Sequence, residues 1–103
     1  KAANEGIIVA GGHSDGPNPN QLDDAEGIFV DQQSNVYVAD SRNHRVMRWS
    51  LNSGQGTLII GGHGTGTESD QFRNLRGLTI DQQANIYVVD KNNHRVQRFD
   101  SFM

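Results

Sequence analysis

The stretch Asn35-Val36-Tyr37-Val38-Ala39-Asp40 recurs 50 residues later as Asn85-Ile86-Tyr87-Val88-Val89-Asp90. The same shift aligns residues 6–50 with residues 56–100 without a gap, and 19 of these 45 positions are identical. A period near 50 residues is typical of β-propeller blades rather than of helical solenoids or coiled coils. The sequence therefore predicts two copies of one small β-sheet unit.

Short apolar runs rich in Val, Ile, Tyr and Phe alternate with clusters of Asn, Asp, Gly and Ser, which is the pattern of strands joined by turns. The segments 31–35 and 81–85 are short enough for hairpin turns. No stretch has the apolar spacing of a long amphipathic helix. Strands are expected near residues 6–11, 27–31, 35–40, 44–49, 56–61, 77–81, 85–90 and 94–99.

The central strand of each copy is apolar on both faces. Side chains alternate along a strand, so Val36 and Val38 face one way while Tyr37 and Ala39 face the other. A strand that is apolar on both faces is covered on both faces. Sheets stacked face to face in a ring meet this condition, because each sheet has a neighbour on either side.

The motif residues resemble a known family. The two stretches quoted above, followed by Asn43-His44-Arg45-Val46 and Asn93-His94-Arg95-Val96, closely resemble the NHL repeat, and Gly27 and Asp31 match its preceding strand. The resemblance covers nearly the whole chain. It implies a six-bladed β-propeller of four-stranded antiparallel blades, which commonly binds proteins and sometimes RNA. This chain departs from the family in holding only two repeats.

The order of the expected strands predicts an incomplete ring. We expect one unit over residues 1–103, in which residues 27–61 form a complete blade and residues 77–99 form three inner strands of a second. Residues 6–11 would be the outer strand that completes a blade of another chain. Head-to-tail contacts of this kind close into rings, so a homotrimer with six blades is predicted. A dimer with four blades or a tetramer with eight lies within the architecture's range.

Composition disfavours several classes of function. The formal net charge of −3 lacks the basic excess of proteins that bind nucleic acid through phosphate. No apolar run is long enough to cross a bilayer, and none of signal-peptide length follows Lys1. Cysteine is absent, which excludes disulfides and thiolate metal sites. No compartment is predicted.

Eight polar motif residues are interpreted as structural, because a catalytic pair rarely recurs in every repeat. Charge-assisted hydrogen bonds among them would tie together the loop between the second and third strands of each blade. The eight residues are Asp40, Asn43, His44 and Arg45, with their copies Asp90, Asn93, His94 and Arg95. No enzymatic activity and no cofactor are predicted.

Histidines offer an alternative that we consider weaker. His13 and His63 would be presented three times each by a trimer, and three imidazoles can hold zinc. Some propellers resembling this family, such as the amidating lyase, bind zinc through histidines in the central channel. Here the histidines follow outer strands, far from the channel, which disfavours both a metal site and a lyase-like enzyme.

The long loops 14–26 and 64–76 differ most between the copies. Asp23, Asp24 and Glu26 in the first become Arg73, Asn74 and Arg76 in the second. In a propeller these loops share a face with the loops 41–43 and 91–93, and loops on a rigid scaffold often carry specificity.

Protein or peptide recognition on this loop face is the preferred function. Loops without a ligand, RNA binding, and an excised or engineered piece whose only activity is assembly remain alternatives. The candidate binding residues are Arg42, Arg73, Arg76 and Lys91.

Overall fold

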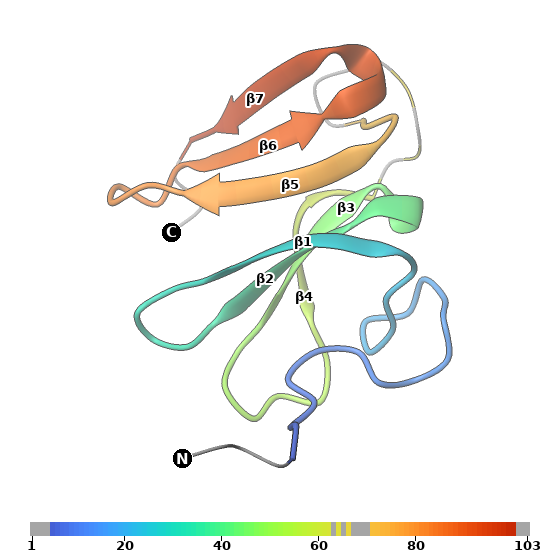
Figure 1. Cartoon of the computed structure of the whole chain (residues 1–103), viewed down its shortest axis with the longest axis vertical. Helices are drawn as coiled ribbons and strands as arrows, with labels where there is room; N and C mark the ends of the chain where they lie inside the picture. Colours follow the sequence, from blue (N-terminus) through green and yellow to red (C-terminus); the bar gives the residue numbers. More distant parts are fainter. Residues whose placement is uncertain (1–4, 63, 65, 67–70, 101–103) are drawn as a thin grey trace.

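The alternation of short apolar runs and turn residues produces an all-β chain, as expected. The computed structural model describes residues 5–62, 64, 66 and 71–100. The first antiparallel sheet contains, in sequence order, β1 (Ala25–Val30), β2 (Val36–Asp40), β3 (Arg45–Trp49) and β4 (Thr57–Gly61). The second contains β5 (Leu75–Ile80), β6 (Ile86–Asp90) and β7 (Arg95–Phe99). Two 3-10 turns, η1 (Ser41–Asn43) and η2 (Lys91–Asn93), follow the central strands, and Figure 1 shows the two sheets stacked.

The hairpin between β1 and β2 is fixed by one carboxylate. Asp31 accepts hydrogen bonds from the backbone N–H groups of Gln33 and Asn35 and from the hydroxyl of Tyr37. Ser34 adopts a φ of 67°, a left-handed conformation that closes the turn. The second hairpin repeats this arrangement around Asp81. The turn therefore sets the strand register locally, in the same way in both copies.

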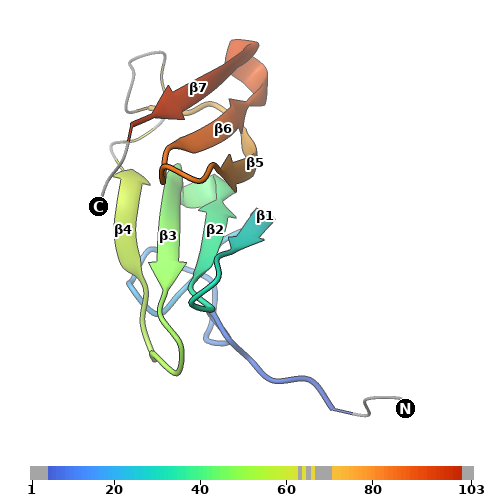
Figure 2. The same ribbon diagram turned by 90° about the vertical axis from the view of Figure 1, so that its left-hand side faces the viewer.

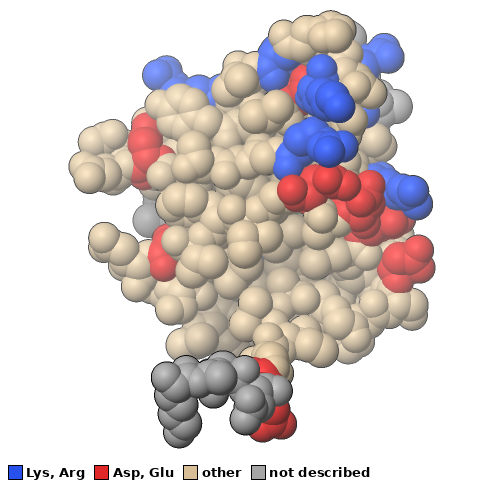
Figure 3. Space-filling view, viewed as in Figure 1, with Lys and Arg blue, Asp and Glu red and all other residues tan. Residues whose placement is uncertain are grey.

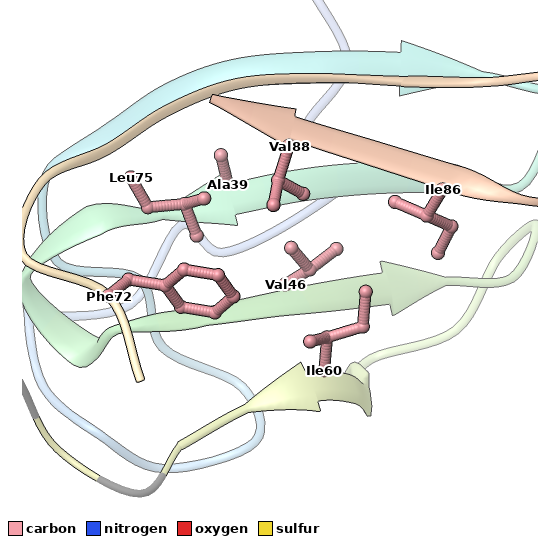
Figure 4. Packing of buried hydrophobic residues seen from close by; sticks show 7 residues of the cluster. All are labelled: Ala39, Val46, Ile60, Phe72, Leu75, Ile86 and Val88. Atoms are coloured by element: carbon pink, nitrogen blue, oxygen red, sulfur yellow. The ribbon is translucent and has the colours of Figure 1, made fainter. Parts of the chain in front are cut away.

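The main hydrophobic core lies between the two sheets. Close approach of β1 and β5 requires Gly27, because a Cβ atom there would lie 2.7 Å from the carbonyl oxygen of Arg76. Figure 4 shows side chains from both sheets and from the segment before β5 converging on one cluster. The cluster contains Ala39, Val46, Ile60, Phe72, Leu75, Ile86 and Val88.

A second cluster covers the opposite face of the first sheet. Its buried members are Val36, Val38, Met47 and Trp49, against which Ala10 and Leu22 pack. All five residues of β2 are buried, so the expectation of a strand covered on both faces holds for the first copy. In β6 it holds for one face only, since Val89 is 41% exposed. The chain supplies no third sheet among the described residues to cover that side.

The segment before the first long loop extends away from the first sheet, as Figure 2 shows. Within residues 5–12, which we call the arm, Ile7, Ile8 and Val9 are 87%, 72% and 56% exposed. The arm forms no strand with the described part of its own chain. The expected strand at 6–11 requires a second chain, so it stays a prediction.

Over the described residues, no helix is long or apolar enough to cross a bilayer.

Candidate functional site

A buried carboxylate organises the end of the first sheet where η1 lies. Asp40 is fully buried and accepts hydrogen bonds from the backbone N–H of Asp23 at 2.7 Å and from Asn43 Nδ2 at 2.8 Å. Arg45 Nε donates to the same carboxylate at 2.8 Å. A buried charge needs such partners, because removing it from water without them is costly. The three side chains therefore form one ionic network at the base of the loop face.

The network also holds the long loop that precedes β1. The Arg45 guanidinium donates to the carbonyl oxygens of Pro17 at 2.8 Å, Asn18 at 3.2 Å and Gln21 at 3.0 Å. Asn43 Nδ2 donates to the carbonyl oxygen of Gly16 at 2.9 Å. These bonds connect residues 24 to 28 positions apart in the chain. The motif residues Asn43 and Arg45 thus hold the loop before β1 in place, a contact that was not predicted from the sequence.

The second copy repeats the network around Asp90. Arg95 Nε donates to it at 3.0 Å and Asn93 Nδ2 at 2.7 Å, while the backbone N–H of Arg73 donates at 2.8 Å. Burial alone would raise the pKa of Asp90 above its ordinary 3.8, but these hydrogen bonds outweigh it and the pKa is lowered. The Arg95 guanidinium also donates to the carbonyl oxygen of Gln71 at 2.8 Å. Both long loops therefore rest on the same frame.

The two motif histidines act through their backbone conformation at the ends of the 3-10 turns. His44 and His94 end the 3-10 turns in the left-handed conformation, with φ of 51° and 55°. The carbonyl oxygen of His44 accepts a hydrogen bond of 2.8 Å from the N–H of Gly62, which follows β4. Here the backbone of His44, rather than its ring, links η1 to the outer strand.

Charged side chains of both signs gather on the side of the molecule that carries the long loops. Figure 3 shows an acidic group next to a basic one there. Arg42, whose side chain is 71% exposed, lies 3.9 Å from both Asp23 and Asp24. Arg73 and Lys91 are exposed, and no ion pair joins either to another described residue. Of the four candidate cations, Arg42 lies on η1, Lys91 on η2 and Arg73 in the loop before β5, while Arg76 lies on β5 itself.

One ion pair connects the two copies across the sheet junction. Arg76 Nε on β5 lies 3.6 Å from Glu26 Oε1 on β1. A hydrogen bond with Asp24 raises the pKa of Glu26, and the charge of Arg76 opposes this shift. Glu26 and Arg76 occupy the same position in the two repeats. The pair is therefore a contact between equivalent sites of opposite charge.

Two grooves flank the first sheet at its other end. A groove of about 520 Å³ lies between the two hairpin turns, with Phe29, Tyr37 and Ile80 among its lining residues. A more apolar groove of about 610 Å³ runs between the arm and the first sheet. Its walls include Ile8 and Val9 on one side and Val30 and Trp49 on the other.

The metal alternative has no geometric support within the described part of the chain. No three side chains of His, Cys, Asp or Glu lie together there. His13 is exposed on the segment after the arm, and His63 lies outside the described residues.

The comparisons with known proteins agree with the geometry of the second copy. Residues 72–99 match the family model of the NHL repeat. The match begins with Phe72, in the core between the sheets, and ends with Phe99, the last residue of β7. The resemblance found in the motif residues is thereby confirmed. No curated protein matches the chain.

Proposed function

We propose that this chain, which carries an NHL repeat, forms a two-blade sector of a β-propeller and serves as a non-enzymatic scaffold that binds a protein or peptide on its loop face. Other copies of the chain complete the ring, and three of them give six blades. From here the first sheet is called blade 1 and the second blade 2. The NHL match supports the propeller type.

The observation that carries the proposal is a pair of exposed apolar patches, one on the open face of blade 2 and one on strand β1 of blade 1. Ala39 and Val46 of blade 1 are fully buried against blade 2. Val89 and Val96, at the same positions in blade 2, are 41% and 66% exposed. Register places these two valines opposite each other on one face. Blade 2 thus exposes the face that corresponds to the one by which blade 1 packs against blade 2.

Blade 1 presents the complementary surface. Leu78 and Ile80 of blade 2 pack against the core between the blades. Ile28 and Val30, their counterparts in blade 1, are 63% and 51% exposed. Exposed apolar patches of this kind mark interaction sites. A second copy that places its blade 2 on this face would repeat the interface already present within the chain.

The charges at the junction between blades support the same arrangement, in which a second copy packs beside blade 2. Within the chain Glu26 of blade 1 pairs with Arg76 of blade 2. In a ring of copies, the next Glu26 would lie on the other side of Arg76, so unlike charges would alternate at every junction. Complementary charge favours one orientation of docking over others. The alternation therefore supports head-to-tail contact between blade 2 and blade 1.

The loop face supports a protein or peptide ligand over RNA. Arg42 and Arg76, two of the four candidate cations, lie beside carboxylates, which lowers the positive potential available to phosphates. Arg73 and Lys91 remain as exposed cations beside the part-buried hydrogen bonds around Asp90. Such a mixed face suits a ligand that carries both carboxylates and donors.

Selection from a displayed peptide library tests the binding function. Peptides enriched on the wild-type chain should lose at least tenfold in affinity on an Arg73→Ala, Lys91→Ala variant and keep it on a Gln55→Ala control at the other end of blade 1. Failure to enrich any peptide, or equal binding by both variants, would contradict the proposal. Tight binding of a homopolymeric RNA with steep salt dependence would favour the RNA alternative instead.

A further inference from the structure

We propose that the groove between the two hairpin turns, residues 31–35 and 81–85, binds an arginine side chain of a partner protein. This turn groove lies at the opposite end of the sheets from η1 and η2, and Figure 1 shows both turns projecting on one side of the molecule. It is a second surface, apart from the loop face, and it is built within one chain. The inference therefore depends neither on the loop-face ligand nor on assembly of copies.

The size and lining of the turn groove suit one long, polar side chain. Its volume of about 520 Å³ lies within the range of ligand pockets, about 300–1,000 Å³. None of the described residues that line it is a Lys, Arg or His. Both blades contribute a carboxylate and a glutamine, and blade 1 adds two aromatic rings. These lining residues are Asp31, Gln32, Phe29 and Tyr37 of blade 1 and Asp81 and Gln82 of blade 2.

The two carboxylates of the groove are held by neutral donors. Asp31 accepts hydrogen bonds from the backbone N–H groups of Gln33 and Asn35, from the Asn35 amide and from the Tyr37 hydroxyl. Asp81 accepts the equivalent four bonds in blade 2. Within the described part of the chain, neither carboxylate forms an ion pair. Neutral donors stabilise a carboxylate without cancelling its net charge.

Both carboxylates are ionised at neutral pH. Partial burial raises the pKa of Asp31, but hydrogen bonds from Asn35 and Gln33 outweigh it, and the pKa is lowered from 3.8. The pKa of Asp81 is lowered as well, first of all by the backbone N–H of Asn85. Like charges in a hollow surface concentrate the field and attract a ligand of opposite sign. The groove is therefore suited to a cation.

Two aromatic rings line the groove on the side of blade 1. Phe29 and Tyr37 are paired across β1 and β2, with ring centroids 6.4 Å apart and planes inclined at 61°. Alternation places them on the same face of blade 1 as Ala39, which is buried against blade 2. Arg48 is paired with Tyr37 in register but does not line the groove. A guanidinium stacks on aromatic rings and is attracted by their faces, which favours arginine over a neutral side chain.

Glutamine amides supply acceptors for the ligand. Gln32 and Gln82 occupy the same position in the two turns, and both are exposed and line the groove. Each carboxylate already accepts about as many hydrogen bonds as it has lone-pair sites. The carboxylates therefore contribute charge, while the glutamine oxygens accept the ligand's hydrogen bonds. A guanidinium offers five N–H donors against three for an ammonium, so arginine makes fuller use of these acceptors than lysine.

NMR titration of the isotopically labelled chain tests the proposal. The probe is the peptide Gly-Ser-Arg-Ser-Gly, blocked at both ends so that arginine carries its only charge. We expect saturable shifts centred on the backbone amide signals of Gln32, Gln33 and Gln82. The same peptide with citrulline, a neutral analogue of arginine, should bind about tenfold more weakly, because it loses the charge-assisted interactions.

A matched pair of variants separates the groove from general attraction to an acidic chain. Gln82→Lys places a competing cation in the groove and should weaken binding of the arginine peptide about tenfold. Gln83→Lys adds the same charge to the same turn, at an exposed residue that does not line the groove. Its effect should stay below about threefold, since exposed charges are screened by salt.

A third variant tests the aromatic contribution. Phe29→Leu keeps an apolar side chain but removes one ring, and should weaken binding about threefold. The Arg73→Ala, Lys91→Ala variant should bind the arginine peptide as the wild type does, because those two cations lie near η2 at the opposite end of the sheets. This result keeps the groove distinct from the proposed loop-face function.

Three outcomes would overturn the inference. They are equal binding of the citrulline peptide, equal losses in Gln82→Lys and Gln83→Lys, and shifts confined to residues outside the two turns. Putrescine, a free diamine, cannot stack as a guanidinium does and should bind more weakly than the peptide. Tighter binding of putrescine would contradict a protein partner and assign the groove to a free polyamine.

Discussion

Val96 occupies in the second blade the position that Val46 occupies in the first, yet Val46 is fully buried and Val96 is 66% exposed. The two valines lie on equivalent strands and share the same register with their central strands. Their environments differ because blade 2 covers Val46, while the described chain contains nothing to cover Val96. This difference in exposure is the physical basis of the proposal that another copy packs on the open face of blade 2.

Replacing Val96 with Asp should abolish assembly and leave the single chain folded. A carboxylate on the open face would be buried without a partner in the interface, which is strongly unfavourable. Because Val96 is exposed in the isolated chain, we expect the secondary structure by circular dichroism to stay unchanged. Sedimentation velocity should show at least a tenfold weaker association than for the wild type.

The matched variant of that experiment is Val46→Asp, which places the same charge inside the chain's own core. It should unfold the chain, since Val46 is fully buried between the blades. If Val96→Asp assembled as the wild type does, the exposed face of blade 2 would not be the interface.

Replacing Asp40 with Ala should destabilise the chain by about 3–5 kcal/mol, the typical effect of removing one partner of a buried ion pair. Arg45, only 8% exposed, would remain charged with its carboxylate gone. The N–H of Asp23 and the amide of Asn43 would lose their acceptor too. Urea denaturation followed by circular dichroism measures the change.

Asp100→Ala is the control for that variant. Asp100 and Arg98 form an ion pair at 2.7 Å whose side chains are 74% and 57% exposed, so removing it should change stability by less than about 1 kcal/mol. Equal effects of the two substitutions would show that burial of the Asp40 network contributes little.

Charge reversal at the junction tests the alternation of Glu26 and Arg76. Arg76→Glu and Glu26→Arg should each weaken association by about threefold to tenfold at low salt, because like charges would face each other on both sides. The double variant restores unlike neighbours everywhere and should assemble as the wild type does. The difference should shrink in high salt, since the pair is partly exposed. Single variants that associate normally at low salt would contradict the proposed alternation.

Stability should fall as the pH drops below about 4. The pKa values of Asp31, Asp81 and Asp90 are lowered from their ordinary 3.8 by hydrogen bonds in the folded state. The unfolded chain therefore takes up protons first as the pH falls. The stability that these carboxylates contribute is present above their unfolded pKa and is lost as the pH falls through the folded one.

Urea denaturation at fixed chain concentration between about pH 6 and pH 2 measures this dependence. An Asp81→Asn variant should start less stable at neutral pH and lose less on acidification, because one of the three carboxylates is gone. A wild-type free energy of unfolding that stayed constant over this range would contradict the assigned role of these carboxylates.

The strands could be predicted from the sequence because their signal is local. Alternation along Val36-Tyr37-Val38-Ala39 and the repeat at Ile86-Tyr87-Val88-Val89 fixed seven strands to within two residues of their observed ends. The sequence repeat also predicted that the two sheets are built in the same way. Residues 6–11 differ, because they form no strand with the described part of the chain, and their expected pairing with another copy stays a prediction.

The reach of the polar network could not be predicted in the same way. The guanidinium of Arg45 binds carbonyl oxygens of Pro17, Asn18 and Gln21, and backbone acceptors leave no mark in the side-chain pattern. A usable signal was nevertheless present. Gly16 and Gln21 recur as Gly66 and Gln71 inside loops that otherwise differ, and all four contribute carbonyl groups to the frame.

Native mass spectrometry of the wild-type chain over a range of dilutions tests most directly whether the open blade faces bind other copies. We expect a discrete species of three times the chain mass of 11.3 kDa, which dissociates on dilution. No species larger than this trimer should appear at any concentration. A well-folded species of a single chain mass at every concentration would contradict it.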